Sequence, residues 1–181
     1  MGNATASVSL QITARDVLTA GLKAGVIPIQ FNNILELTTG LLDTQIDLAW
    51  SASRVAMPAG GTTNMDLSGA LNDSFGNVVQ FAEVVLIAFR NNRADASAYL
   101  LLAPAAANGF GRLASSKGFW PADLGADTDQ GNVVGPTSWL CLYDPIGVPV
   151  TAGTGDILSI TTSAVVGSTN AWDILILGRS A

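Results

Sequence analysis

The run Val84-Val85-Leu86-Ile87-Ala88-Phe89, within the segment 78–89, decides the fold class. A strand with one face in water alternates apolar and polar residues, whereas this run is apolar on both of its faces. Such a strand has to be covered on both sides. We therefore expect it to be a central strand of a sheet that lies between two layers.

Short segments rich in Val, Ile, Leu and Thr flank this run on both sides. They are separated by frequent turn residues, with 19 glycines and 7 prolines in 181 residues. Most of them alternate with a period of two, as Val8, Leu10 and Ile12 do. We predict about eight strands; the candidate segments are 6–13, the residues 34–37 within the mixed stretch 27–38, 45–57, 62–67, 78–89, 97–102, 139–143, 156–162 and 172–177.

One segment has a helical pattern. Thr13 can cap a helix over Arg15–Ala24, where Val17, Leu18 and Leu22 share a face, and Gly25 follows as a C-terminal stop. Gly21 disfavours a helix here because glycine has a low helix propensity. The sequence therefore predicts one short N-terminal helix at most.

With almost no helix to cross over between parallel neighbours, the strands should pair antiparallel. We predict an all-β, antiparallel two-sheet sandwich that is jelly-roll-like, in a single domain over residues 1–181. Residues 1–30 would form an N-terminal arm or strand with the short helix. Regular patterning fades from Pro104 to Gly135, so residues 104–135 are expected to form a long loop insertion of the kind that usually serves function.

The composition favours protein contacts over other partners. Apolar residues make up 49% of the chain and charged residues only 12%, and the net charge is −6. The eight basic residues are scattered singly, so we expect no nucleic-acid partner. No apolar stretch reaches the length of a membrane span and no secretory signal is visible, which predicts a soluble protein without a membrane partner.

The side chains on which most enzymes depend are missing. The chain has no histidine, which excludes Ser-His-Asp and Cys-His catalysis and leaves paired carboxylates as the common option. Glu83 alternates with apolar residues, and we interpret it as a hydrogen-bonded structural carboxylate in preference to an acid with a raised pKa. The lone Cys141 lies in an apolar run and is expected to be a small buried residue. We expect no enzyme activity and no cofactor.

A weak calcium pattern occurs inside the long insertion. Asp123, Asp127, Asp129 and Asn132 offer oxygen ligands, but Gly131 is one place early for a calcium loop and Ser138 stands where the bidentate glutamate belongs. A solvated acidic turn is therefore the preferred interpretation.

Aromatic residues give the best candidates for contacts with other molecules. Phe110, Phe119 and Trp120 lie in the long insertion and are the expected interface anchors. Trp50, Trp139 and Trp172 lie in or at the ends of predicted strands, where burial is the default.

Three segments in the C-terminal half resemble a known class of proteins. They are Val84-Val85-Leu86-Ile87-Ala88-Phe89-Arg90-Asn91, then Pro149-Val150-Thr151-Ala152-Gly153-Thr154-Gly155-Asp156-Ile157-Leu158-Ser159-Ile160, and Trp172-Asp173-Ile174-Leu175-Ile176-Leu177-Gly178-Arg179. This layout of turns and strands is similar to that of small structural proteins of tailed bacteriophages. Some of these are jelly-roll decoration, or cement, proteins on capsids.

The resemblance implies a virion protein, made in the host cytoplasm and placed on the capsid surface. Its partners would be the major capsid protein and itself, as a homotrimer. The second reading is a tail, neck or fibre component, or a carbohydrate-binding adhesin domain. A carboxylate-based glycan hydrolase is the third.

Overall fold

The structure is a computed structural model of the chain, and it describes residues 6–18, 25–73, 75–111, 119–120, 131–163 and 167–181. For residues 6–18 and 25–36 it describes the backbone alone. The described residues form strands, turns and bends, without a helix among them. This confirms the all-β fold class predicted from the alternating segments.

Thirteen strands follow one another along the described chain. They are β1 (Ala6–Leu18), β2 (Gly25–Thr39), β3 (Gln45–Ile46), β4 (Leu48–Met57), β5 (Thr62–Asp66), β6 (Leu71–Asn72), β7 (Val78–Val79), β8 (Glu83–Asn91), β9 (Leu100–Pro104), β10 (Asn132–Val134), β11 (Trp139–Pro149), β12 (Ile157–Thr162) and β13 (Ser168–Arg179).

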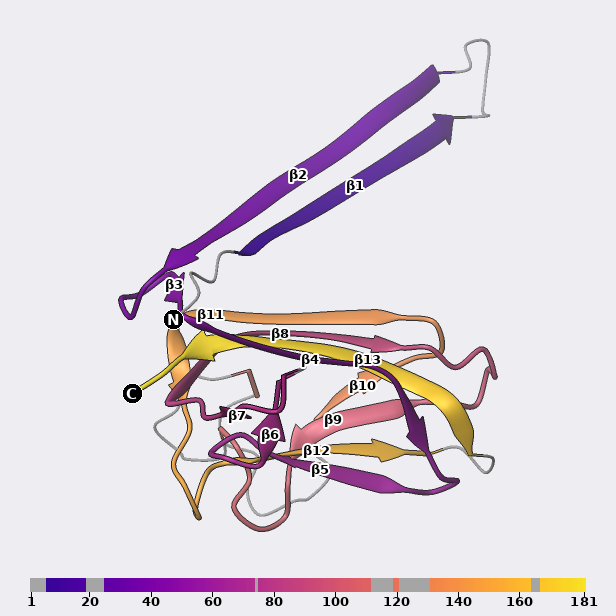
Figure 1. Cartoon of the computed structure of the whole chain (residues 1–181). Coiled ribbons are helices and arrows are strands. Elements are labelled where there is room, and N and C mark those ends of the chain that lie inside the picture. The colour runs from indigo at the N-terminus through magenta and orange to yellow at the C-terminus, as the bar shows by residue number, and fades with distance from the viewer. Residues whose placement is uncertain (1–5, 19–24, 74, 112–118, 121–130, 164–166) are drawn as a thin grey trace.

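Eight of these strands build two stacked four-stranded sheets (Figure 1). One sheet has the order β11-β8-β13-β4, and the other has the order β10-β9-β12-β5. All neighbours within them pair antiparallel. When these eight strands are counted along the chain, the first (β4) and the last (β13) pair in one sheet, and the second (β5) and the seventh (β12) pair in the other. This is the strand order of a jelly roll, as the sequence predicted.

The main core fills the space between the two sheets. β8 and β13 contribute their inner faces, where the rings of Phe89 and Trp172 lie 6.1 Å apart between centroids. β9 and β12 contribute Leu100, Leu158 and their neighbours from the other side. β8 lies between β11 and β13, and five of its apolar residues are fully buried on its two faces. The central position expected for the run 84–89 is thereby confirmed.

The first two strands form an arm outside the sandwich. β1 pairs with β2 over its whole length, from Ala6 opposite Leu37 to Leu18 opposite Gly25. Figure 1 shows this hairpin rising obliquely away from the sheet β11-β8-β13-β4. At its base, β2 pairs in parallel with the short β3, and the chain then enters β4. The arm therefore begins at the outer face of one sheet.

The structure corrects three details of the prediction. Arg15–Leu18 belong to β1 and not to a helix, because the cross-strand pairs with β2 continue through them; residues 19–24 lie outside the described residues. The arm extends to Thr39, beyond the predicted boundary at residue 30. The insertion at 104–135 contains β10, a short strand that pairs with β9 and is too short to show a period in the sequence.

Candidate interaction surface

The outer face of the sheet β11-β8-β13-β4 is organised in rows that run across its strands. One row consists of Cys141, Ala88, Leu175 and Ser51, which are cross-strand partners in that order. The row on one side consists of Tyr143, Leu86, Leu177 and Ala49, and the row on the other side begins with Trp139, Arg90 and Asp173. Because side chains alternate along a strand, all three rows belong to one face.

A second, small core covers the middle of the Tyr143 row. Leu37 from the base of the arm and Ile46 from β3 pack with Leu86 and Leu177, and all four are buried. Only 2% of the surface of Leu37 is exposed to solvent. The base of the arm is therefore fixed on the outer face of the sheet by apolar contacts.

The next row is left largely open by the described residues. Ala88 and Leu175 are partly buried against the second core, and Cys141 and Ser51 are exposed. The row contains no charged residue. Two aromatic residues of the same strand as Cys141, Trp139 and Tyr143, are also exposed, Trp139 by 67%. An uncharged, largely apolar strip therefore lies on the surface beside the arm.

These positions overturn two predictions. Cys141 was expected to be buried and Trp139 was expected to pack in the core, but β11 turns Leu140 and Leu142 inward and presents Trp139, Cys141 and Tyr143 outward. The run 139–143 is apolar at every position, so its alternation could not show which set of residues faces the core.

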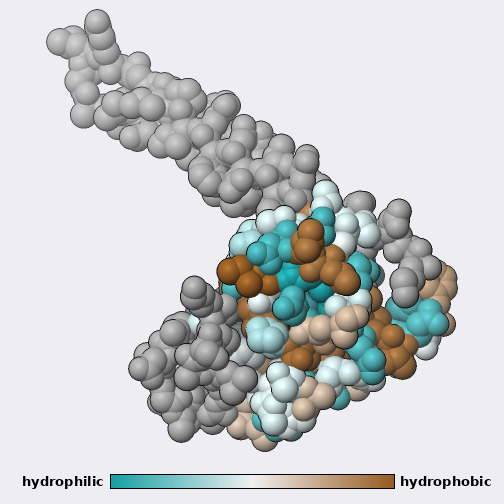
Figure 2. Space-filling view, turned by 90° about the vertical axis from the view of Figure 1, so that its left-hand side faces the viewer, coloured by the Kyte–Doolittle hydropathy of each residue, from teal (hydrophilic) through white to brown (hydrophobic). Residues whose placement is uncertain are grey.

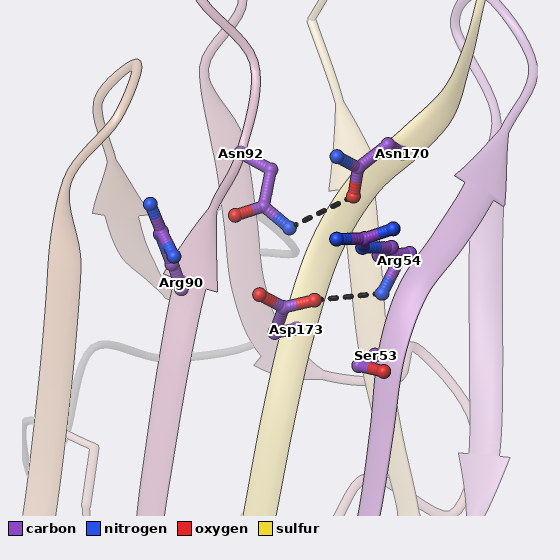
Figure 3. A pocket seen from close by; sticks show the side chains of 6 residues that line it. All are labelled: Ser53, Arg54, Arg90, Asn92, Asn170 and Asp173. Atoms are coloured by element: carbon purple, nitrogen blue, oxygen red, sulfur yellow. Dashed lines mark hydrogen bonds between the residues drawn. The ribbon is translucent and has the colours of Figure 1, made fainter.

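A polar depression of about 360 Å³ ends this face (Figure 3). Its lining residues come from β4, β8 with the residue after it, and β13: Ser53, Arg54, Arg90, Asn92, Asn170 and Asp173. Two hydrogen bonds cross it, from the Arg54 amide to Asp173 Oδ1 at 2.6 Å and from Asn92 Nδ2 to Asn170 Oδ1 at 3.1 Å.

Two consecutive residues of β4, Ser53 and Arg54, line the depression because a β-bulge interrupts the strand there. Ser53 and Arg54 both stand opposite Asp173, and Arg54 has a φ of 53°, in the left-handed region. The Arg90 guanidinium lies 5.0 Å from the centre of the Trp139 ring, in a cation–π contact. Arg90 Nε is buried without a hydrogen-bond partner among the described residues. The depression therefore offers two cations, one carboxylate and two amides beside an aromatic ring.

The base of the arm is tied to the sandwich by a buried arginine. Arg179 Nε donates to Glu83 Oε2 at 2.7 Å, and the Arg179 side chain is 3% exposed while that of Glu83 is 39% exposed. Arg179 also donates to the carbonyl oxygens of Leu42 and Ile146. Glu83 thus takes part in a structural ion pair, in line with the interpretation of its sequence pattern.

Exposed apolar side chains gather at this end of the sandwich. Leu41, Leu42 and Ile146 are each more than half exposed, and Arg179 bonds two of these residues through their backbones. Figure 2 views the molecule from this end and shows hydrophobic residues at the surface between hydrophilic ones.

The expected interface anchors of the insertion lie in the main core instead. Phe110 and Trp120 are buried, and Phe119 packs against the same cluster with its ring centroid 6.2 Å from that of Phe110. Trp120 Nε1 donates to the Phe110 carbonyl at 2.9 Å. The sequence showed aromatic residues in a loop, and the structure shows that they hold this loop to the sandwich instead of being presented to a partner.

The calcium candidates are mostly outside the described part of the chain. Asp123, Asp127 and Asp129 fall in the segment 121–130, which the structure does not describe, and Asn132 begins β10. Over the described residues there is no group of three or more His, Cys, Asp or Glu side chains that could hold a metal ion. Within the same residues, no helix is long and apolar enough to cross a membrane.

Partial desolvation on the outer face raises the pKa values of two exposed side chains. Desolvation raises the pKa of the Cys141 thiol, and it also raises that of Tyr143, to which the nearby charge of Asp144 adds. Both side chains are therefore held more firmly in their neutral forms, which preserves the uncharged character of the strip.

We compared the chain with known protein families, with curated proteins and with solved structures, and none of the three comparisons finds a match.

Proposed function

We propose that this chain is a structural virion protein, a capsid decoration protein that binds the lattice of the major capsid protein as a homo-oligomer and stabilises the head. The observation that carries the proposal is the combination of a jelly-roll sandwich, an uncharged open strip on the outer face of one sheet, and a hairpin arm that begins at this face.

The arm supports a role in assembly. A two-stranded hairpin is at best marginally stable alone in water, and β1 pairs with 13 residues of β2 without a third strand along this length. At about 3.4 Å per residue, 13 residues span roughly 44 Å. An extension of this length is well suited to reach a neighbouring subunit in a lattice.

The surface chemistry is consistent with the same role. Only 12% of the residues are charged, and exposed apolar residues lie both on the outer face and at the base of the arm. Apolar, aromatic-containing patches that exclude charge are typical of the centres of protein interfaces.

The direct test is binding to undecorated heads. Purified chain is mixed with expanded heads of the tailed phage that encodes it, from which the decoration protein has been omitted, and the heads are sedimented. We expect saturable co-sedimentation at a fixed ratio to the major capsid protein and a higher temperature of head disruption. Chain that stays in the supernatant at every concentration would refute the proposal.

The depression supports a second candidate, a carbohydrate-binding tail or adhesin domain. Sugar sites commonly combine an aromatic ring with several polar side chains. The Trp139 ring contacts Arg90, which lines the depression together with Asn92, Asn170 and Asp173. A glycan array distinguishes this candidate: binding that is lost in Trp139→Ala and retained in Tyr99→Ala, at another exposed aromatic residue, would favour it.

A further inference from the structure

The register of the arm sorts its residues into two faces of different character. Successive pairs alternate between the faces of the ribbon. One face holds the positions Ala6–Leu37, Val8–Leu35, Leu10–Asn33, Ile12–Phe31, Ala14–Ile29, Asp16–Ile27 and Leu18–Gly25, and the other holds Ser7–Glu36, Ser9–Ile34, Gln11–Asn32, Thr13–Gln30, Arg15–Pro28 and Val17–Val26. The first set is mostly apolar and is called the apolar face below. The second set is mostly polar.

The base of the arm shows what this apolar face fits. Leu37 belongs to it and is buried on Leu86 and Leu177, on the outer face of the sheet β11-β8-β13-β4. The neighbouring row on the same sheet, from Cys141 to Ser51, continues this surface. Among the described residues nothing comparable covers that row, and Figure 1 shows the arm leaving the sheet instead of lying on it. The chain therefore carries an apolar ribbon and an open uncharged strip that do not meet within one copy.

We propose that the apolar face of β1–β2 of one copy docks on the outer face of the sheet β11-β8-β13-β4 of a second copy, next to that copy's own Leu37. This inference rests on the homo-oligomer of the proposed function and names the surfaces that form it. The occupant is a second copy because the contact at Leu37 already joins these two surfaces within the chain, and the docked arm extends the same contact.

The area that the arms can offer reaches that of a stable interface. Thirteen paired residues span roughly 44 Å, and two strands spaced about 4.8 Å apart give a ribbon about 10 Å wide. One face of the arm can therefore cover up to about 440 Å². Counting both sides of the contact and a reciprocal exchange of arms, two copies bury up to about 1,800 Å², within the usual range of about 1,200–2,000 Å² for a specific complex.

A proline in β2 favours docking by the face of the arm over the addition of a further strand to its β2 edge. Pro28 interrupts the backbone donors of β2, opposite Arg15, and proline limits pairing with a further strand. The apolar face remains the extended surface by which the arm can bury apolar area.

The test uses the full chain with two double variants of the arm. Ile12→Asp with Phe31→Asp places charges on the apolar face, and Thr13→Asp with Gln30→Asp places the same charges one position away on the polar face. Light scattering after size exclusion gives the mass, and maleimide labelling of the single native thiol, Cys141, reports whether the outer face is covered. Circular dichroism and thermal melting verify that each variant folds.

We expect the unmodified chain to be an oligomer in which Cys141 reacts slowly. The variant of the apolar face should be a monomer whose Cys141 reacts at least about tenfold faster, in line with loss of a well-buried contact worth more than about 1.4 kcal/mol. The matched variant of the polar face should keep both the mass and the slow reaction.

A receiving-side variant separates docking on the sheet from pairing of arms with each other. Ser51→Arg places a charge on the open row, and Asn64→Arg, on the exposed side of β5, is its control. We expect Ser51→Arg alone to be monomeric and its mixture with the Ile12→Asp/Phe31→Asp variant to form heteromers, because one partner supplies intact arms and the other an intact face. Only one arm docks in such a pair and about half the area is buried, so the heteromers should need a higher protein concentration than the unmodified oligomer. A mixture that stays monomeric at every concentration up to the solubility limit would refute docking on the sheet.

The other outcomes overturn the inference in distinguishable ways. A monomer with a protected Cys141 would mean that the arm folds onto its own sheet, and a monomer with a reactive Cys141 that becomes protected only on heads would assign the face to the capsid protein. An oligomer that survives the Ile12→Asp/Phe31→Asp change would have another interface. In contrast, an arm-dependent oligomer that ignores heads would refute the proposed function and leave this inference intact.

Discussion

Asn91 is a buried polar residue that joins three segments at one end of the sandwich. It is fully buried at the end of β8, and its Nδ2 donates to the Ala98 carbonyl at 2.8 Å and to the Val134 carbonyl at 3.0 Å. Its Oδ1 accepts the Arg93 amide at 3.0 Å. One side chain thereby joins β8 to the chain before β9 and to β10, the strand that ends the long insertion.

The substitution Asn91→Asp keeps the shape of this side chain and removes its donors. The two carbonyls then face a carboxylate oxygen, and each buried hydrogen bond that is replaced by an unpaired group costs about 1–3 kcal/mol. With two such bonds, we expect the free energy of unfolding at neutral pH to fall by about 3–5 kcal/mol. For a chain of this size, about 2–4 °C per kcal/mol corresponds to a drop of roughly 10 °C in Tm.

The loss should depend on pH with a defined sign. Burial and the two carbonyl oxygens disfavour the charged form, so the pKa of the introduced carboxyl is raised in the folded chain. The folded state then binds its proton more tightly than the unfolded state does. The deficit relative to the unmodified chain is smallest below the unfolded pKa of about 4, grows as the pH rises, and becomes constant above the folded pKa.

Thermal melting is followed by circular dichroism at steps of about one pH unit from pH 4 to 8. This series measures both the loss of stability at neutral pH and its dependence on pH. Asn92→Asp is the matched control, since Asn92 makes an exposed hydrogen bond to Asn170 and its change should cost less than about 1 kcal/mol. A Tm of Asn91→Asp within about 3 °C of the unmodified chain at pH 7, or a deficit that grows toward low pH, would refute the reasoning.

Three further predictions follow from the contacts of single side chains. Glu83→Gln removes the carboxylate from the buried Arg179 and should lower the free energy of unfolding by about 1–3 kcal/mol in urea titration, less than a fully buried pair because Glu83 is partly exposed; an unchanged midpoint would contradict this. Trp120→Phe loses the hydrogen bond to the Phe110 carbonyl and should lower the free energy of unfolding by about 1–2 kcal/mol in urea titration. Trp120→Ala also leaves a cavity in the core and should lower it by about 3–5 kcal/mol, and equal losses for the two variants would show that packing is unimportant there. Because burial raises the pKa of Cys141, the midpoint of its alkylation rate against pH should lie higher in the folded chain than in concentrated urea, and the stability gained from the neutral thiol should be lost as the pH rises past the unfolded value; coincident midpoints would count against this.

The fold could be predicted from the sequence because the signal that decides it is local. A run that is apolar at consecutive positions has to lie between two layers, and β8 does so. The segment Arg15–Leu18 shows where local reasoning ends. Val17 and Leu18 fit one face of a helix and equally a strand, and the pairing with Val26 and Gly25 across the hairpin decides between them. Cross-strand pairing is a tertiary contribution that helix propensity does not count.

The buried aromatics of the insertion were misjudged for a related reason. Phe110 follows a stretch without a period, and nothing in the sequence indicates that its amide donates to the Ile157 carbonyl at 2.9 Å. This backbone bond and the Trp120 side chain bring the insertion back into the main core. A loop that returns to the core through isolated contacts has no periodic signature, so the default expectation of an exposed loop fails there.

β11 shows how the missing information bears on function. Its outward residues Trp139, Cys141 and Tyr143 are as apolar in type as its inward residues Leu140 and Leu142, and a strand whose outer face met only water would gain nothing from this. In β8 the same two-sided pattern is explained within one copy, because the arm base covers the outer Leu86. The edge strand has no such cover among the described residues, although desolvation by its surroundings already raises the pKa of Cys141. The proposed docking of a second copy accounts for an apolar outer face on an edge strand that lies beside an arm with a matching apolar face.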